Sequence, residues 1–478
     1  MVNLKGMRGY VTKGGELSSM PFWLLIALLI VMIPLGGSSQ RIFWGVIVIR
    51  PLAILAACLG AWTLTREQIR ARWFLFAMLG SAMVLTALEL IPLPYEVWSR
   101  LPGRDIIVDI DHTAGLPRIA RPFTMSPTNT RNALFSMVIP IATLILGAQL
   151  THQQIRLLLP VFAGISLLSA GLACLQILGV IDAPLSWYQI ASDGSATGLF
   201  TNRNHQAILL ALSIPMLGII ASYKSRKSQF RPIICVLLGV FLLPLILLTG
   251  SRGGLVFAAL CVPAAVVIFW IMQGATSGDQ IPRLSGRYRK MITLAGVGFT
   301  LVLSATIGVT IASGRAETIN RFVAMDISDT LRQQTWGVVR QAISTFMPVG
   351  SGIGSYEPVF STLEPAAYLR PTYSNHAHND WLEVVMTSGL AGVAWLLAGV
   401  IAFVILSRDT LRAVRAGRRT GWSLLGAVIL LTGGGSSLVD YPLRVPIMQA
   451  FYVVACLWAT LDLQAPRRCS RTPAEPVE

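Results

Sequence analysis

Long apolar stretches follow one another along nearly the whole chain, and they constrain its fold more than any other feature. Stretches of about 17–25 apolar residues cross a bilayer as helices, because a helix satisfies its own backbone hydrogen bonds. Only 13% of the residues are charged, against roughly 25% in soluble domains. The sequence therefore predicts an all-α, polytopic membrane protein with about twelve spans, near residues 20–36, 43–64, 73–93, 133–150, 157–178, 204–222, 232–249, 254–272, 291–313, 381–406, 422–439 and 446–462.

Clusters of basic residues in alternate connections predict the orientation of the chain. Placing both termini in the cytoplasm puts all four clusters on the cytoplasmic side, as the positive-inside rule requires. The formal charge of +16 then reflects topology, and no nucleic acid is expected as a partner. The first stretch follows Lys5, Arg8 and Lys13, so a cleavable signal peptide is an alternative for it. The clusters are Arg66/Arg70/Arg72, Lys224/Arg226/Lys227/Arg231, Arg283/Arg287/Arg289/Lys290 and Arg408/Arg412/Arg415/Arg418/Arg419.

Two long loops are expected on the opposite, outer side, at 94–132 and 314–380. In the second loop, Ser328 is a candidate cap for a helix that runs to Phe346 and has one apolar face. Pro348 and the glycines of 350–354 are expected to end this helix. Such a helix would lie on the lipid headgroups or roof a cavity. The Gly350–Gly354 run follows no strand, which favours a turn over a nucleotide-binding loop.

Two arginines are expected at the outer rim of the membrane. Arg252 lies in Gly250-Ser251-Arg252-Gly253-Gly254, between two apolar stretches, where glycines allow a ligand to approach the backbone. Arg203 begins another stretch beside Asn202 and Asn204, whose amides suit sugar hydroxyls. Guanidinium binds phosphate through two parallel hydrogen bonds and stays charged. The alternatives are a snorkelling or turn arginine for Arg252, and an ordinary Asn-capped helix start for Arg203.

The segment Asn375-His376-Ala377-His378-Asn379-Asp380 enters the tenth stretch from the same side. A histidine there is a candidate general base, with Asp380 or Glu383 orienting the ring. The two histidines and an aspartate are alternatively a metal site. The later outer turn Asp440-Tyr441-Pro442-Leu443-Arg444 is interpreted as an interface anchor through its charges.

Four motifs in this order resemble the O-antigen ligase and polysaccharide polymerase superfamily of bacterial inner-membrane enzymes. They are Gly198 to Asn204, Ser251-Arg252-Gly253-Gly254, Arg332 with Trp336 and Ala342 before the glycine run, and His378-Asn379-Asp380 with Gly389 eleven positions later. The resemblance covers roughly 198–392. It divides the chain into N-terminal spans with the outer loop (1–197), a ligase-like catalytic region (198–406) and C-terminal spans with a tail (407–478).

The resemblance implies transfer of a glycan from undecaprenyl diphosphate to an acceptor hydroxyl at the periplasmic face, without a nucleotide, cofactor or metal. His378 would be the base, and Arg203 and Arg252 would stabilise the departing diphosphate. The acceptor would be lipid A–core for a ligase, or another lipid-linked glycan for an O-antigen or exopolysaccharide polymerase. A flippase or transporter is the alternative of another class. Substrate contacts are expected from Arg332, Asn202, Asn204, Asn379 and Asp380.

Overall fold

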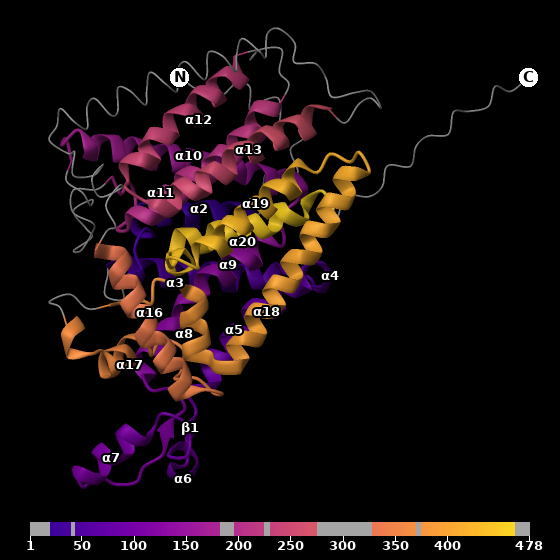
Figure 1. Ribbon diagram of the computed structural model, residues 1–478. Helices are drawn as coiled ribbons and strands as arrows, with labels where there is room; N and C mark the ends of the chain where they lie inside the picture. Colours follow the sequence, from indigo (N-terminus) through magenta and orange to yellow (C-terminus); the bar gives the residue numbers. More distant parts are fainter. Residues whose placement is uncertain are drawn as a thin grey trace, which may run out of the picture.

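The computed structural model describes residues 20–39, 44–181, 196–223, 230–274, 327–369 and 374–463. These residues are mostly helical, and one short antiparallel pair of strands accompanies them (Figure 1). The elements are α2 (Met20–Leu35), α3 (Trp44–Thr63), α4 (Arg66–Ala71), α5 (Trp73–Leu88), β1 (Pro92–Leu93), α6 (Tyr95–Trp98), α7 (Asp105–Thr113), β2 (Arg121–Pro122), α8 (Pro127–Ser136), α9 (Val138–Gly147), α10 (His152–Ile177), α11 (Arg203–Ser222), α12 (Arg231–Leu248), α13 (Arg252–Gly274), α16 (Ile327–Phe346), α17 (Tyr356–Leu363), η1 (Ala366–Tyr368), α18 (Asp380–Arg415), α19 (Gly421–Ser436), η2 (Pro442–Arg444) and α20 (Pro446–Leu461).

Seven helical segments in the described ranges are long and apolar enough to cross a membrane. The predicted polytopic, helical character is therefore confirmed. Four further apolar helices, α2, α5, α19 and α20, are shorter, at 10–17 residues. The span expected at 291–313 lies outside the described residues. The seven segments are Trp44–Thr63, Pro127–Gly147, His152–Ile177, Arg203–Ser222, Arg231–Leu248, Arg252–Gln273 and Asp380–Arg415.

Helix α11 forms the centre of the packed bundle, and 94% of its apolar window is buried. Helices α10, α12, α13 and α19 pack around it, and α20 pairs with α19 (Figure 1). Small residues permit the closest crossings: a Cβ added at Gly218 would lie 2.6 Å from the Ala265 carbonyl oxygen of α13. Without a hydrophobic drive between helices in lipid, such close packing is a main source of association.

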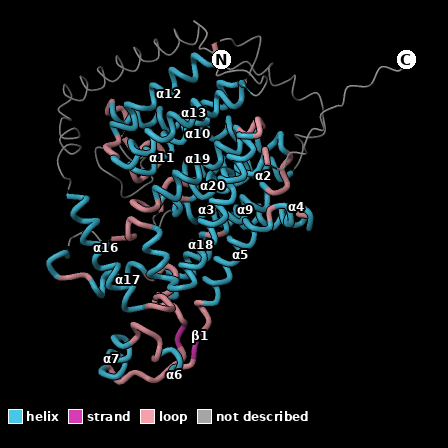
Figure 2. The backbone as a smooth tube through the Cα atoms, turned by 45° about the vertical axis from the view of Figure 1, so that its right-hand side comes forward, coloured by secondary structure: helices cyan, strands magenta, loops and turns pink. Residues whose placement is uncertain are grey.

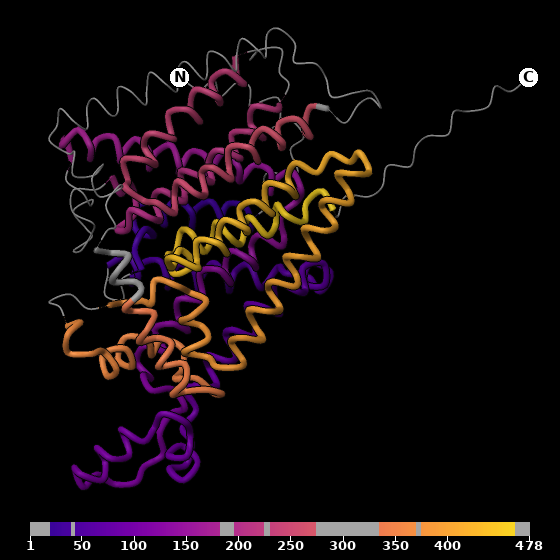
Figure 3. The backbone as a smooth tube through the Cα atoms, in the orientation of Figure 1, coloured from indigo at the N-terminus to yellow at the C-terminus, as the bar shows by residue number. Residues whose placement is uncertain are grey.

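Helix α18 is interrupted at Gly389, whose φ of 54° and ψ of −139° are not helical. The span predicted at 381–406 is therefore two limbs, Asp380–Ser388 and Leu390–Arg415, which diverge in direction (Figure 3). The loop after α16 packs into the break: the Leu390 amide donates to the Pro348 carbonyl at 2.8 Å, and the Gly352 amide donates to the Thr387 carbonyl at 2.7 Å. The glycine run is thus a turn, as expected, and it wraps around the break.

The amphipathic helix predicted in the second outer loop is present as α16, and it ends at Phe346 as expected. Its start was predicted wrongly, because Ser328 lies inside the helix rather than before it. The apolar face, with Val338, Val339 and Ala342, packs against Tyr356 of α17 and Met386 of α18. This face is therefore covered by protein and is not free to lie on lipid.

Most of the loop predicted at 94–132 forms a small lobe that projects from the body of the protein (Figure 2). It contains α6, α7 and the antiparallel pair β1–β2. Arg104 fastens the lobe to the body: it is fully buried, and its guanidinium donates to the carbonyls of Phe123 at 2.8 Å and Gly350 at 3.2 Å. Burial lowers the pKa of Arg104 to about 10, so the side chain remains a cation at neutral pH.

Candidate functional site

A buried carboxylate between α19 and η2 joins three segments that are distant in sequence. Asp440 is only 1% exposed. Its Oδ1 lies 3.3 Å from Nδ1 of His378, and its Oδ2 accepts a hydrogen bond from Nδ2 of Asn202 at 3.2 Å. Nε2 of His205 lies 3.9 Å from the same carboxylate. Asp440 is therefore the centre of the first cluster of candidate functional residues.

His378 is held in an unusual conformation at this carboxylate. Its φ of 49° lies in the left-handed region, which costs on the order of 1–3 kcal/mol for a residue other than glycine. The side chain is 32% exposed, so the ring is accessible on one side. When Nδ1 donates to Asp440, Nε2 is left as a proton acceptor. An imidazole held by a carboxylate in this way is suited to general base chemistry.

The helices that carry Arg203 and Arg252 both start at the same turn. Asn202 caps α11 by accepting from the Asn204 amide at 2.8 Å, and it also contacts Asp440. At the start of α13, a Cβ added at Gly253 would lie 3.7 Å from Val439, the residue before Asp440. Two helix N-termini, each with a half-buried arginine, thus approach the His378 cluster. Helix N-termini and guanidinium groups both favour anions.

The second histidine belongs to a different and more enclosed cluster. His376 Nδ1 lies 3.1 Å from Oε1 of Glu383, which also binds Nη1 of Arg444 at 3.1 Å. Nε of Arg444 donates to Oδ1 of Asp380 at 2.8 Å. Burial lowers the pKa of His376, and the neighbouring Glu383 offsets this only in part. His376 is therefore a neutral imidazole at pH 7.

The ring of Tyr441 lies between the two clusters. Its centroid is 4.7 Å from that of His376, 5.0 Å from that of His378 and 5.2 Å from that of His205. Burial raises the pKa of Tyr441, so the hydroxyl stays protonated. The aromatic ring separates the two histidines that are only two residues apart in sequence.

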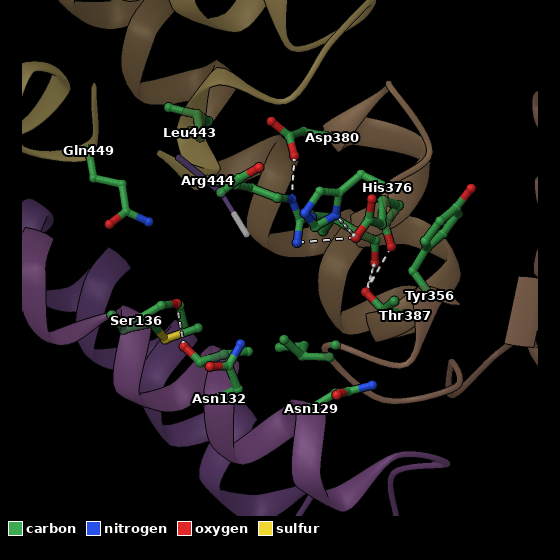
Figure 4. Close-up of a pocket in the computed structure, with 18 of the residues that line it drawn as sticks. Asn129, Asn132, Ser136, Tyr356, His376, Asp380, Thr387, Leu443, Arg444 and Gln449 are labelled. Atoms are coloured by element: carbon green, nitrogen blue, oxygen red, sulfur yellow. Dashed lines mark hydrogen bonds and ion pairs between the residues drawn. The ribbon is translucent and has the colours of Figure 1, made fainter. Parts of the chain in front are cut away.

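A cavity of about 380 Å³ opens beside the His376 cluster. Figure 4 shows Arg444, Asp380 and His376 on one side, and Asn129, Asn132 and Ser136 of α8 on the opposite side. Gln449 of α20 also faces the cavity. The predicted site residues are split by this geometry, because Asp380 lines the cavity whereas His378, Arg203 and Arg252 do not.

Several residues expected to contact substrate use their side chains within the protein. Asn379 caps α18 by accepting from the Leu382 amide at 3.0 Å, as Asn202 caps α11. Asn204, the second residue of α11, is half-buried at the start of that helix. Arg332 lies in α16, but its side chain is outside the described residues.

Glu383 contacts a histidine ring, as expected, but the ring is that of His376, 3.1 Å away at Nδ1, whereas the carboxylate at His378 is that of Asp440. Asp380 binds Arg444 instead of a histidine. The Asp440–Arg444 turn does more than anchor an interface, since Asp440 contacts His378 and Arg444 joins the second cluster. The sequence feature that could have indicated these contacts is a carboxylate and an arginine within one short connection between apolar stretches. In the described ranges, no three His, Cys, Asp or Glu side chains are grouped as a metal site requires.

Comparison with known families matches residues 234–397 to the family model described as O-antigen ligase. A search among curated proteins found no match. The matched stretch includes Arg252 and His378, and it ends before Asp440. The turn that completes the histidine cluster therefore lies outside the matched residues.

Proposed function

We propose, from the premise that this chain belongs to the O-antigen ligase and polysaccharide polymerase superfamily, that it is a multi-pass membrane glycosyltransferase of the ligase type. It would move a glycan from undecaprenyl diphosphate to a hydroxyl of lipid A–core. The reaction would take place at the periplasmic face of a bacterial inner membrane. The donor's own diphosphate is the leaving group, so the reaction needs neither a nucleotide nor a metal.

The chemistry assigns a separate role to each residue. Nε2 of His378 takes the proton of the acceptor hydroxyl as its oxygen attacks the anomeric carbon of the donor. The bond from that carbon to the diphosphate oxygen breaks, and its electron pair leaves with the diphosphate. Arg203 and Arg252 stabilise the charge that develops there, an effect that is strongest where the donors are already in position. Asp440 orients His378 and stabilises the imidazolium that forms.

The observation that carries this proposal is the meeting of His378, Asp440 and the N-termini of α11 and α13 at one turn. A base and two anion-binding helix ends in one place match a reaction that removes a proton and releases a diphosphate. For metal independence, purified enzyme should transfer glycan in excess EDTA. Loss of activity on chelation, restored by a divalent ion, would contradict the arginine mechanism.

The alternative within the family is an O-antigen or exopolysaccharide polymerase, in which the acceptor is a second lipid-linked glycan. Glycolipid gels of a deletion strain separate the two. A ligase mutant accumulates long polymer on polyprenyl diphosphate and bare lipid A–core. A polymerase mutant retains single repeat units and has no long chains.

A transporter is the alternative of another class, and the broken helix α18 is a feature that transporters share. Residues on both sides of this break, Thr387, Ser388 and Gly392, line the cavity beside His376, so the broken helix does not separate the two classes, whereas the family match supports an enzyme. We therefore favour an enzyme. Transfer of a glycan by purified protein in sealed vesicles, with no transmembrane gradient, distinguishes the two classes.

A further inference from the structure

We propose that the cavity beside the His376 cluster is the acceptor site, and that Arg50 in α3 binds a phosphate group of an amphiphilic acceptor there. This inference rests on the function proposed above. Arg50 is the seventh residue of α3, a cation placed within an apolar helix, and the transfer chemistry makes no use of it. Ionisable residues within membrane helices are costly and mark functional sites.

The surroundings of Arg50 leave its charge without a counterion. In the described part of the chain, its one hydrogen bond goes from Nη1 to Oδ1 of Asn132 at 2.8 Å. Within the described ranges, no carboxylate lies within 4.0 Å of its guanidinium. Asp380 and Glu383 line the same cavity, but both bind Arg444. A half-buried guanidinium that faces a cavity without an acidic partner is suited to an external anion.

Amide groups near Arg50 supply further binding capacity. Asn129 and Asn132 of α8 face the cavity together with Gln449 (Figure 4). Oε1 of Gln449 is a buried acceptor without a hydrogen-bond partner in the described protein. A buried acceptor that lacks a donor is costly, and a hydroxyl of a bound sugar would supply one. Asparagine and glutamine side chains both donate and accept, as binding to sugar hydroxyls requires.

One part of the cavity wall is apolar. Ala82 and Leu85 of α5 and Trp395 and Leu396 of α18 line it. The outer surface of α5 is also apolar and exposed, with Met83 at 41%, Val84 at 56% and Leu88 at 53%, which places this helix against lipid. A cavity with a polar end and an apolar wall beside the bilayer fits a ligand that has both a headgroup and acyl or prenyl chains.

The charged side chains that line the cavity determine which end of the acceptor binds at Arg50 and which end binds beside His376. At the His376 end of the cavity, two carboxylates, those of Asp380 and Glu383, share one guanidinium, that of Arg444. That end of the cavity repels phosphate and accepts hydrogen bonds from hydroxyls. The phosphate is therefore placed at Arg50 and the acceptor sugar at the His376 end, from which the reacting hydroxyl must reach past the ring of Tyr441 to His378.

Two acceptors share this chemistry: phosphorylated lipid A–core and a second polyprenyl diphosphate-linked glycan. The experiment measures transfer by purified protein in phosphatidylcholine nanodiscs, with each acceptor varied in turn and the donor saturating. Arg50→Gln should raise the KM for the true acceptor about 10–100-fold, the value of a charge-assisted hydrogen bond to phosphate. The donor KM should stay within about twofold. Whichever acceptor shows this rise identifies the enzyme as ligase or polymerase.

A matched control uses the neighbouring helix. Arg131 is exposed, lies one residue from Asn132 and does not line the cavity, so Arg131→Gln should leave both KM values unchanged. Arg50→Lys keeps the charge and should give an intermediate KM. An equal rise in both acceptor and donor KM, or none in either, would overturn the inference.

A second measurement needs no variant and therefore survives a folding failure of Arg50→Gln. Wild-type enzyme is given lipid A–core with and without its phosphates. Dephosphorylation alone should raise the acceptor KM about 10–100-fold, and an unchanged KM would contradict the phosphate contact. Where Arg50→Gln folds, combining it with dephosphorylation should add nothing, because the cycle removes one shared contact. If the effects of dephosphorylation and of Arg50→Gln on the acceptor KM add, the phosphate binds at a site other than Arg50. If wild-type enzyme transfers glycan to neither acceptor, the proposed function fails instead.

Discussion

His376 and His378 are two residues apart, yet the fold puts them in different chemical settings. His378 has a partly exposed ring, a left-handed backbone and one carboxylate partner, Asp440. His376 is enclosed with Glu383, which Arg444 already neutralises. The first can give and take a proton at a substrate, while the second is a neutral group that closes one end of a cavity. Proximity in sequence therefore says little about function, and the partners contributed by distant segments decide it.

The largest expected effect comes from His378→Ala, which should lower the transfer rate by about 10²–10⁴-fold because it removes the general base. The measurement is glycan transfer by purified enzyme with a lipid-linked donor. His376→Ala is the matched variant and should retain activity within about tenfold, since its ring only lines the cavity. If His376→Ala loses transfer activity and His378→Ala keeps it, the roles assigned to the two histidines are wrong.

Next in size are Arg203→Lys and Arg252→Lys. Removing one donor to a developing oxyanion costs about 10²–10³-fold in kcat, and lysine recovers only part of this because it lacks the planar fork. Each variant should be produced at the normal level and be poorly active. Arg131→Lys serves as the control. Full activity with lysine at both positions would reduce these arginines to snorkelling charges.

A smaller loss is expected for Asp440→Asn, about 10–100-fold in kcat, as for other residues that orient a reactive side chain. Asp440 is a positioning residue, so the KM values for donor and acceptor should hardly change. Asp440→Glu should restore part of the rate. A rise in KM without a fall in kcat would indicate that Asp440 shapes a binding surface and does not support His378.

The smallest effect concerns stability in acid. Burial lowers the pKa of His376 below its ordinary 6.5, so below about pH 6.5 the unfolded chain binds a proton that the folded chain resists. The contribution of His376 to stability is thus complete above that pH and is lost as the pH falls. His376→Gln should flatten the decline of the melting temperature between pH 7 and 5. An unchanged slope would contradict the neutral, enclosed state of His376.

The helical, membrane-spanning architecture could be predicted because apolar length alone requires it. The approach of α11, α13 and the His378 segment was suggested only by their common side of the membrane. The Asp440–His378 contact was not predictable, since it joins residues 62 positions apart and depends on how α19 packs. The break at Gly389 was also not predictable. One residue with non-helical backbone angles does not change the hydropathy of an apolar stretch.

The short limb of α18, Asp380–Ser388, is held at both ends, and this fixes the direction in which its side chains point. Its start is tied to α19, where the Asp380 amide donates to the Ser437 carbonyl at 2.8 Å, and its end is tied at Leu390 to Pro348. A helix turns by about 100° per residue. One inserted or deleted residue between the two ties would turn Asp380 and Glu383 by about 100° relative to Leu390, so the two ties could not both be kept. The number of residues from His378 to Gly389 therefore determines the face on which Asp380 and Glu383 lie. Insertions and deletions there should be tolerated far less than in the lobe at 94–122.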